Sequence, residues 1–448
     1  MTPRIDIHTH LFSALDIPIE GYLRSRRSEK RSLCDVEYLV NFFPGPQIFT
    51  YLADRMRERV VTRRMGSGRK GAFYRLLLWV FEKIMRQNFQ VWEDSLTKTQ
   101  DANARDLQAT WPGVDLFVPL MIDYEYWFKN TMDTPIDRQI VRMAEHVVLP
   151  GGGRFHPFAP FDPVRELVHR KGLNNPDGQK ETVSPMAWIK KAVRDMGFIG
   201  VKLYNSLGYR PAGNGDADML LRRWRIGVRN EKMQYVFDGH EIDAVMDELF
   251  AWCEKEDVPV TAHCMDRGIE AYPGASEPFG GARRWRPVLD RHPGLRLNLA
   301  HFGWNPAPGI GYGAPGNWMR EVCGMICEYG HVYADVAHHE VTSRAKRREL
   351  TEAYRTIQRE FAADLDKIRK RILYASDWHV LRRIPNYESF MNRYAEILKQ
   401  TEFCDDMDDF LGGNALRFLG LEKGGRNRKR LERFYAKSGR PVPAWLAG

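Results

Sequence analysis

Two histidines separated by a single residue stand near the start of the chain, in the segment IDIHTH from Ile5 to His10. Apolar and polar residues alternate along this segment, which is typical of a β-strand. Side chains two apart on a strand share a face, so His8 and His10 can reach one metal ion while Thr9 points away. Imidazole is a common ligand of Zn²⁺ and other first-row divalent ions. The segment therefore predicts one part of a metal site.

Further polar residues stand near the ends of later apolar runs, and the types that bind metals are Lys202, His263, His301 and Asp377. Binding of one ion by His8, His10, His263 and Asp377 would use three nitrogens and one oxygen. A position for water would remain open, as a catalytic zinc site requires. Lone histidines elsewhere are interpreted as hydrogen-bonded core residues, and these are His156, His331, His338 and His379.

Eight short apolar runs are separated by polar, amphipathic segments, which is the pattern of strands joined by crossover helices. The runs cover residues 5–10, 115–121, 154–161, 197–204, 258–264, 295–303, 331–339 and 371–379. Crossover helices are expected over 184–196, 241–256, 285–294 and 346–369. Eight such units predict a (β/α)8 TIM-type barrel, in which catalytic groups gather at the carboxyl ends of the strands. A doubly wound open sheet is the alternative, although no glycine-rich phosphate-binding motif follows any run.

The ordered set of motifs resembles the amidohydrolase superfamily. It is most similar to the amidohydrolase-related branch, which contains metal-dependent hydrolases and decarboxylases similar to aminocarboxymuconate semialdehyde decarboxylase. The resemblance extends from Ile5 to about Leu421, through HxH, GVKLYNSLGYRP, VTAHC, LNLAHFGW, LYASDWH and GGNALRFLGL. It implies that the metal ligands are His8, His10, His263 and Asp377. It also implies that His301 is either a ligand of a second ion or a catalytic histidine.

Lys202 distinguishes a site with one ion from a site with two. In two-metal members of the superfamily, the resemblance implies, a lysine at the end of the fourth strand is carboxylated and bridges both ions. In many one-metal members this lysine is not a ligand. Carboxylation requires a neutral amine, so burial would have to lower the lysine pKa. A site with one ion and a site with two ions are therefore both possible interpretations, and the expected ion is Zn²⁺. In a two-ion site, Lys202 and His301 would be the additional ligands.

Loops after the predicted strands suggest how a substrate would be bound. Tyr204, Arg210 and Arg267 fall near the expected barrel mouth, and Trp304 follows His301 closely. Arginines there could bind a carboxylate or phosphate in a fork geometry, although surface ion pairing would explain them equally well. Trp304 could form an aromatic wall or simply pack in the core.

These features predict a metal-dependent hydrolase for a small carbonyl-containing substrate, which would be anionic if the arginines bind it. The substrate would be an amide, lactone or ester, attacked by a metal-activated water whose proton Asp377 accepts. The alternative is a metal-dependent nonoxidative decarboxylase or hydratase on the same scaffold. Asp6 stands where some decarboxylases of this branch have a glutamate, which mildly favours hydrolysis.

The predicted domain organisation is one barrel over residues 1–423 with a helical cap inserted at 20–110, followed by a basic tail at 424–448. The insertion could cover the barrel mouth or form an oligomer contact, so a homo-oligomer is an alternative. Residues 73–84 have the spacing of an amphipathic helix, which we expect to pack on the protein itself rather than on a membrane.

Composition indicates a globular protein, because 43% of the 448 residues are apolar. The net charge is +9, and part of the excess lies in the tail. A solvated helix or loose arm is preferred there over a nucleic-acid site, since no nucleic-acid motif accompanies it. A noncatalytic binding protein is the rival class, and its binding would survive metal loss and depend steeply on salt.

Six cysteines are scattered along the chain without the density of a disulfide scaffold. Cys323 and Cys327 have the spacing of one helical face and are expected in the core. No segment has the pattern of a signal peptide or the length of a membrane span. We therefore expect a reducing, cytoplasmic location, a small-molecule substrate, and neither a nucleic-acid nor a membrane partner.

Overall fold

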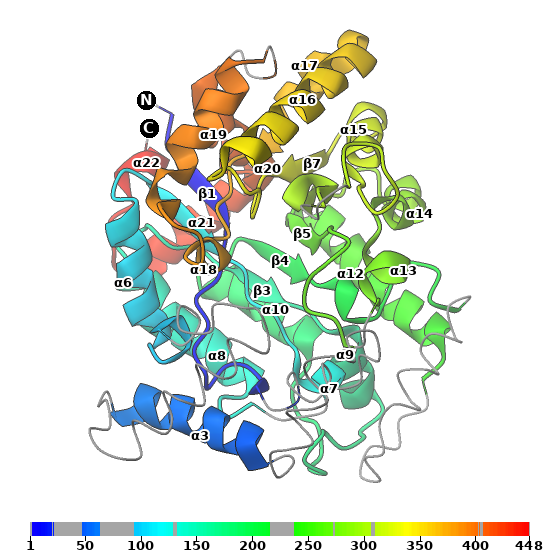
Figure 1. Cartoon of the computed structure of the whole chain (residues 1–448). Coiled ribbons are helices and arrows are strands. Elements are labelled where there is room, and N and C mark those ends of the chain that lie inside the picture. Colours follow the sequence, from blue (N-terminus) through cyan, green and yellow to red (C-terminus); the bar gives the residue numbers. More distant parts are fainter. Residues whose placement is uncertain are drawn as a thin grey trace.

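Strands and helices alternate along the chain in the computed structural model (Figure 1). The structure describes residues 2–19, 21, 47–62, 94–128, 132–215, 237–271, 274–305, 310–401, 403 and 406–447. The strands are β1 (Ile5–Thr9), β2 (Leu116–Pro119), β3 (Phe158–Pro160), β4 (Gly200–Leu203), β5 (Val260–His263), β6 (Leu297–Ala300), β7 (Val332–Asp335) and β8 (Ile372–Leu373). Each of them lies within one of the predicted runs, so all eight predicted strands are confirmed.

All strand pairs are parallel, and the strands follow one another in sequence order. β1 pairs with β2, while β3 to β8 form a second sheet. Backbone hydrogen bonds connect the two sheets on one side from Phe117 N to Arg154 O (2.8 Å) and on the other from Ile7 N to Tyr374 O (3.3 Å). The α/β barrel is therefore confirmed, although its ladders do not form one continuous closed sheet in the described ranges. The sequential order has no switch point, which excludes the doubly wound alternative.

Every strand residue is buried. This is expected of a parallel sheet whose outer face is covered by helices and whose interior is filled by side chains. Because the strands are parallel, their carboxyl ends lie at the same end of the barrel. Polar residues at these ends are therefore brought together from distant parts of the sequence.

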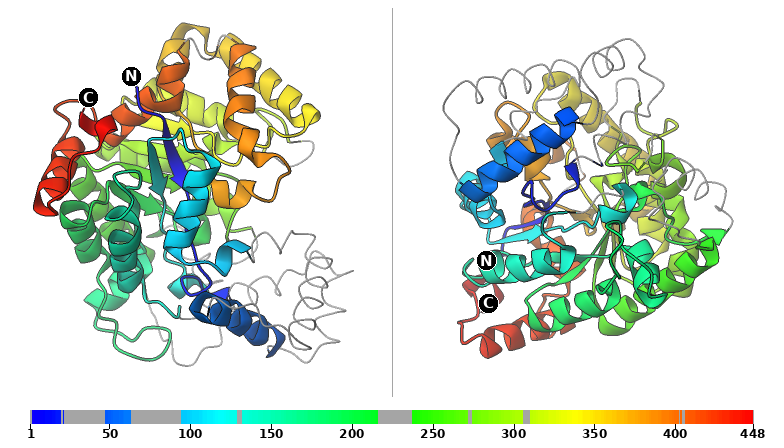
Figure 2. Two further views of the ribbon diagram at one scale, coloured as in Figure 1. Left: turned by 90° about the vertical axis from the view of Figure 1, so that its left-hand side faces the viewer. Right: turned by 90° about the horizontal axis from the view of Figure 1, so that it is seen from below.

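The helices follow the strands and cover the barrel (Figures 1 and 2). The described α-helices are α3 (Gln47–Thr62), α6 (Gln100–Thr110), α7 (Glu125–Phe128), α8 (Ile136–Met143), α9 (Pro163–Arg170), α10 (Pro185–Asp195), α12 (Gly239–Glu256), α13 (Ser276–Gly280), α14 (Arg286–Arg291), α15 (Met319–Glu328), α16 (Arg344–Glu360), α17 (Leu365–Arg369), α18 (Trp378–Leu381), α19 (Phe390–Lys399), α20 (Asn414–Leu419), α21 (Arg426–Lys437) and α22 (Ala444–Ala447).

Side-chain caps define where two of the predicted crossover helices begin. Ser184 accepts a hydrogen bond from Ala187 N at the start of α10, and Asp238 forms a capping box with Glu241 at the start of α12. The helix predicted over 285–294 is shorter and forms α14. The helix predicted over 346–369 is divided into α16 and α17.

The region predicted as a helical cap is described only in part. α3 lies beyond the carboxyl end of β1, whereas α6 connects β1 with β2 on the side of the barrel (Figures 1 and 2). The helix predicted over 73–84 lies outside the described residues. The cap over the barrel mouth therefore stays a prediction. No helix in the described ranges combines the length and apolar character needed to cross a bilayer.

The basic tail packs against the barrel. α21 buries Leu431, Phe434 and Tyr435, and the Asn427 side chain donates hydrogen bonds to Ile199 O (2.7 Å) and Leu419 O. Figure 2 shows that both chain ends lie on the same side of the molecule. Of the two expected forms, the helix is confirmed with one face exposed, and the loose arm is wrong.

The cysteines that the structure describes are Cys253, Cys264, Cys323 and Cys327, and all four are free thiols. Cys323 is buried and Cys327 is partly buried, both on α15. The expectation that this pair belongs to the core is confirmed.

Candidate metal centre

β1 directs two imidazole rings into the barrel. His8 and His10 are both buried, and their ring centroids are 5.2 Å apart. The Nδ1 atom of His10 donates a hydrogen bond to Leu120 O at 2.8 Å. Metal-binding histidines commonly donate their second ring N–H in this way, which fixes the ring and leaves the other nitrogen for the ion. His10 Nε2 is therefore available as a ligand.

Asp377 lies beside these rings because the end of β8 is tied to β1. Its backbone N–H donates to His8 O at 2.8 Å, and it begins α18 in a left-handed conformation with φ of 54°. Its Oδ1 atom is 3.7 Å from His10 Nε2 and has no hydrogen-bond partner within the described part of the chain. Burial raises the pKa of Asp377. A buried carboxylate oxygen without a partner is costly, so this atom fits a cation.

The ligand atoms offered by His8, His10 and Asp377 all lie within 4.8 Å of one another. Nitrogen and oxygen donors of this kind suit Zn²⁺. Three of the four residues predicted to share an ion are thus brought together. The fourth, His263, is not part of this group.

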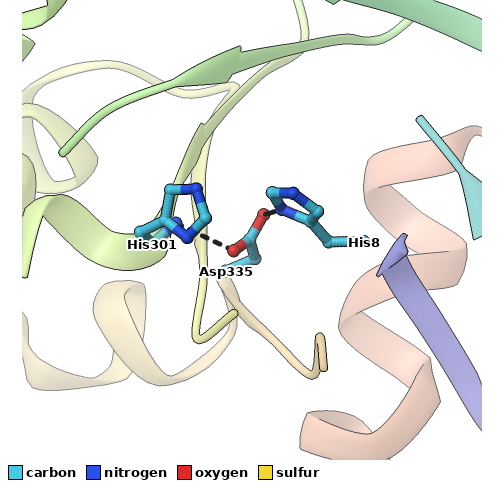
Figure 3. A group of neighbouring side chains, drawn as sticks. All are labelled: His8, His301 and Asp335. Atoms are coloured by element: carbon cyan, nitrogen blue, oxygen red, sulfur yellow. Dashed lines mark hydrogen bonds and ion pairs between the residues drawn. The ribbon is translucent and has the colours of Figure 1, made fainter. Parts of the chain in front are cut away.

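Asp335, at the end of β7, lies between His8 and His301 (Figure 3). Its Oδ2 atom accepts a hydrogen bond from His8 Nδ1 at 3.1 Å, and its Oδ1 atom accepts one from His301 N at 2.9 Å. Burial would raise the pKa of Asp335, but the interaction with His8 and these hydrogen bonds hold it well below its usual value. Asp335 therefore orients His8 so that Nε2 can face an ion.

Asp335 was not among the predicted site residues. Together with His8 and His301 it forms a second group of potential metal ligands. Its position at the carboxyl end of the seventh strand corresponds to that of His263 on β5. The predicted run extended past Asp335 to His339, so selecting the polar residue at its end missed Asp335, which is where the strand ends.

His301 and His263 face each other through two ring nitrogens. His301 Nε2 is 3.1 Å from His263 Nδ1. The opposite nitrogens donate to backbone carbonyls, from His301 Nδ1 to Ala337 O and from His263 Nε2 to Arg267 O at 2.6 Å. Two neutral rings arranged in this way point lone pairs at each other. The separation is close to that expected for two nitrogens that bind one zinc ion at about 2.0–2.1 Å, so this pair also fits a cation.

Lys202 is buried on β4, and its Nζ atom makes no hydrogen bond to any residue that the structure describes. The nitrogen is 5.6 Å from the centroid of the Tyr204 ring. Burial lowers the pKa of Lys202 to about 8, and the charges of Asp335 and Asp377 oppose this shift. The lysine therefore belongs to the same electrostatic environment as the two aspartates.

The predicted substrate-binding residues have different positions. Tyr204 stacks on His263, with ring centroids 4.2 Å apart. Arg210 donates to the carbonyls of Gly213 (3.0 Å) and Pro278 (3.2 Å) and so holds its own loop. The Arg267 side chain is exposed, and Trp304 is buried with its ring 6.0 Å from that of His339. The Tyr204 side chain contacts His263, whereas Arg267 contacts this histidine only through its backbone carbonyl. A substrate role for all four residues stays a prediction.

Comparisons with known proteins agree with this description. Residues 5–421 match the family model described as Amidohydrolase. The comparison with curated proteins finds no match.

Three solved structures are similar to this chain at low sequence identity. An amidohydrolase from Burkholderia multivorans with bound zinc is 14% identical, with a TM-score of 0.40 and coverage of 71% of this chain and 86% of that chain. A TIM-barrel protein from Bordetella bronchiseptica is 16% identical, with a TM-score of 0.39 and coverage of 76% and 83%. A chain from Lactobacillus casei ATCC 334, provisionally described as a metal-dependent hydrolase, is 15% identical, with a TM-score of 0.44 and coverage of 94% and 96%. Because the family model covers nearly the whole sequence, this chain belongs to the amidohydrolase family.

Proposed function

We propose that this protein is a metal-dependent hydrolase that acts on a small carbonyl-containing substrate, such as an amide, lactone or ester. The observation that carries the proposal is the convergence of buried ligand atoms from His8, His10 and Asp377 within 4.8 Å of one another. The strands that supply these residues are far apart in sequence and meet only at the carboxyl end of the barrel. Family membership supports a hydrolase of this general type.

In this proposal, His8, His10 and Asp377 hold a zinc ion, and His263 and His301 provide further nitrogen donors beside it. Lys202 and His301 would be the additional ligands if a second ion binds. A zinc ion in such a site polarises a carbonyl oxygen and makes a bound water more acidic.

The protein residues would handle the proton. Asp377 Oδ1, which is buried and has no hydrogen-bond partner in the described ranges, would accept the proton of the attacking water. His301 Nε2 carries a lone pair, so where it is not a ligand it would first take this proton from Asp377 and then give it to the leaving group. Tyr204, stacked on His263, would form one wall of the site. Burial of the whole cluster excludes bulk water and so strengthens these electrostatic interactions.

Asp6 stands where some decarboxylases of this family have a glutamate, and both of its carboxylate oxygens accept hydrogen bonds. Its Oδ2 atom accepts from Ser376 Oγ at 2.5 Å, and its Oδ1 atom accepts from the backbone N–H groups of Ser376 and His8. It therefore supports the backbone around the site. Release of CO₂ or bicarbonate from a carboxylated substrate, without hydrolysis of an ester or lactone, would favour the lyase alternative.

The proposal is tested by metal analysis of purified protein reconstituted with zinc. We expect the wild type to bind at least one equivalent and to hydrolyse members of an ester, lactone and amide panel. His8→Ala and Asp377→Asn should lose that zinc and the turnover while keeping the far-UV circular dichroism spectrum. The control is His331→Ala, because His331, which was expected in the core, is instead exposed at the opposite end of β7. Undiminished zinc binding by both site variants would refute the proposed centre.

A further inference from the structure

His301 is held from three sides by residues at and just beyond the end of β7. The Asp335 carboxylate accepts from its backbone N–H (2.9 Å), and the Ala337 carbonyl accepts from its ring Nδ1 (3.1 Å). His339 Nε2 donates to its backbone carbonyl at 2.9 Å. These three residues are each two apart in sequence. One short segment therefore contacts the N–H, the carbonyl and the ring of the same residue.

The backbone of His301 requires such support. His301, Phe302 and Gly303 have φ values of 65°, 52° and 65°, so three consecutive residues are left-handed. For the two residues that are not glycine, this conformation costs about 1–2 kcal/mol each. Strained backbone of this kind persists where the surrounding structure determines it, and it is frequent at functional sites. Here it places the His301 ring 4.9 Å from the His8 ring and 4.7 Å from the His263 ring, centroid to centroid.

His339 is itself oriented by two buried tyrosines. Its Nδ1 atom accepts a hydrogen bond from Tyr394 Oη on α19 at 2.8 Å. Tyr394 Oη is in turn hydrogen-bonded to Tyr354 Oη on α16. All three side chains are at most 1% exposed.

In this series of hydrogen bonds, the donor and the acceptor of each bond can be assigned in only one way. The carbonyl of His301 can only accept, so His339 Nε2 carries the proton and Nδ1 of the neutral ring must accept. Tyr394 must therefore donate to His339, and Tyr354 must donate to Tyr394. Each donor thus meets an acceptor, from α16 through α19 to the backbone of His301. Aromatic packing alone would not require this match.

We propose that His339, oriented by Tyr394 and Tyr354, is a positioning residue that sets the backbone conformation of His301 and so the direction of its Nε2 atom. One consequence of this inference rests on the proposed function, namely that zinc binding depends on the orientation of His301. His339 itself does not touch the reacting atoms.

The main test compares His339→Gln with His339→Leu. The side-chain amide nitrogen of glutamine can replace Nε2 as the donor to the His301 carbonyl, whereas leucine fills similar space without a donor. We expect His339→Leu to raise the zinc dissociation constant about 10-fold or more, the usual effect of losing an outer-shell partner. His339→Gln should stay within about threefold of the wild type on the same scale. Competition with a chromophoric chelator measures both constants.

Crystal structures of the two metal-free variants provide a second readout that does not depend on zinc. We expect His301 to keep its positive φ in His339→Gln and to leave the left-handed region in His339→Leu. If wild-type protein binds no zinc, the proposed function fails, yet these structures still decide whether His339 positions His301.

Tyrosine variants test the second step of the chain. Tyr394→Phe removes the donor to His339 but keeps the ring, so we expect weaker zinc binding than in the wild type. The matched control is Tyr374→Phe. The Tyr374 hydroxyl is buried with no hydrogen-bond partner in the described ranges, and its ring is 6.0 Å from that of Phe410, which stacks on Tyr394. This control should bind zinc as the wild type does.

Two results would overturn the inference. One is a His339→Leu protein with wild-type zinc affinity and an unchanged His301 backbone. The other is equal loss in the glutamine and leucine variants, which would indicate a requirement for the imidazole in packing rather than for its donor. Should both His339 variants fail to fold, Tyr394→Phe measured against Tyr374→Phe decides the question by the same criteria.

Discussion

The side chains at the proposed metal centre differ in how many of their polar atoms have hydrogen-bond partners. Asp335 has hydrogen bonds to both carboxylate oxygens, from His8, His301 and the Asn298 side chain. Asp377 Oδ1 and Lys202 Nζ, in contrast, are buried without hydrogen-bond partners among the described residues. Unpaired buried polar atoms are costly and are frequent where a ligand or ion belongs. We therefore expect Asp377 and Lys202, whose buried atoms have no such partner, to take part in ion binding or catalysis.

The role of Lys202 can be tested by removing it. Its pKa of about 8 leaves most of the amine protonated at pH 7, so we expect a cation there rather than a carboxylated ligand. Lys202→Ala should keep one equivalent of zinc and lower turnover by roughly 100-fold, because a buried positive charge near developing negative charge is lost. The measurement is metal content with steady-state kinetics.

Lys171→Ala serves as the control, since Lys171 pairs with Glu241 at a partly exposed position away from the centre. A wild-type content of two zinc ions that falls to one in Lys202→Ala would contradict this expectation. That result would instead make Lys202 a ligand of a second ion.

Among the structural elements, the loop after β5 contacts His263 directly. Gly268 has φ of 147°, and a Cβ atom there would lie 2.6 Å from His263 Nε2 and 2.7 Å from Tyr204 Oη. The neighbouring Arg267 carbonyl accepts from His263 Nε2. A glycine is therefore required for the loop to approach this histidine and set the direction of its ring.

Gly268→Ala should displace His263 and weaken zinc binding by about 10-fold, as other changes around a ligand do. Gly274→Ala is the matched control in the same loop. Its φ is also positive, at 80°, but a Cβ atom would meet nothing within 4 Å. It should lose about 1 kcal/mol of stability with normal zinc affinity. Similar zinc affinities for the two variants would show that contact with His263 is unimportant.

A group of buried ion pairs connects the segments that follow β2 and β3. Arg165 on α9 pairs with Asp123, with Glu125 on α7 and with Glu181, and all four residues are buried. Burial, with the nearby charges of Asp123 and Glu181, raises the pKa of Glu125 to about 7 although Arg165 opposes the shift. This cluster carries more carboxylates than one arginine can neutralise.

The raised pKa predicts a pH dependence of stability. A carboxyl group with a higher pKa in the folded state than in the unfolded state holds its proton more tightly when folded. Stability is therefore lost as the pH rises from about 4.5 to about 7. Glu125→Gln keeps an oxygen acceptor for Arg165 without a charge. We expect it to be more stable than the wild type at pH 8, by about 2 kcal/mol, with the difference shrinking toward pH 5.

Chemical denaturation at pH 5 and pH 8 measures this effect. Asp123→Asn is the contrasting variant, because Asp123 accepts from both Arg165 Nε (2.6 Å) and Nη2 (3.1 Å). It should destabilise the protein at both pH values. A pH-independent effect of Glu125→Gln would argue against its titration in the folded protein.

For the molecule as a whole, the C-terminal helices are part of the folded body. Tyr435 Oη hydrogen-bonds to His156 Nε2 near β3 (2.6 Å), and Trp445 Nε1 donates to Gly153 O (2.9 Å). Arg430 donates to the carbonyls of Glu256 (2.6 Å) and Asp257 (3.0 Å) at the end of α12. These contacts lie near the amino ends of strands, away from the proposed metal centre. We therefore expect these contacts to stabilise the barrel rather than to affect the metal centre.

Phe434→Ala should lower the free energy of unfolding by about 3 kcal/mol, because a large buried side chain is removed. Val442→Ala is the control in the same tail, since Val442 is 37% exposed, and it should change stability by less than about 0.5 kcal/mol. Zinc affinity of folded protein should be normal in both variants. Thermal or denaturant unfolding measures the stability of both variants. An unchanged unfolding midpoint for Phe434→Ala would contradict the packed position of α21.

Local sequence patterns were sufficient for the strands, most crossover helices and the chemical type of the centre. Strand and helix periodicity depends on which side chains are buried, and this is written in the order of apolar residues. The alternation in IDIHTH places His8 and His10 on one face whatever the fold around them. The position of Asp377 shortly after a strand is likewise a local property, read directly from LYASDWH.

Tertiary structure alone decided which of these groups meet and how each ring is turned. The pairing of Asp335 with His8 spans 327 residues, and the rotation of His263 toward Arg267 O depends on the course of one loop. The left-handed backbone of His301 and the packing of the basic tail are also absent from any local pattern. The physical reason is that hydrogen-bond partners and burial are set by residues distant in sequence, which come together only when the barrel forms.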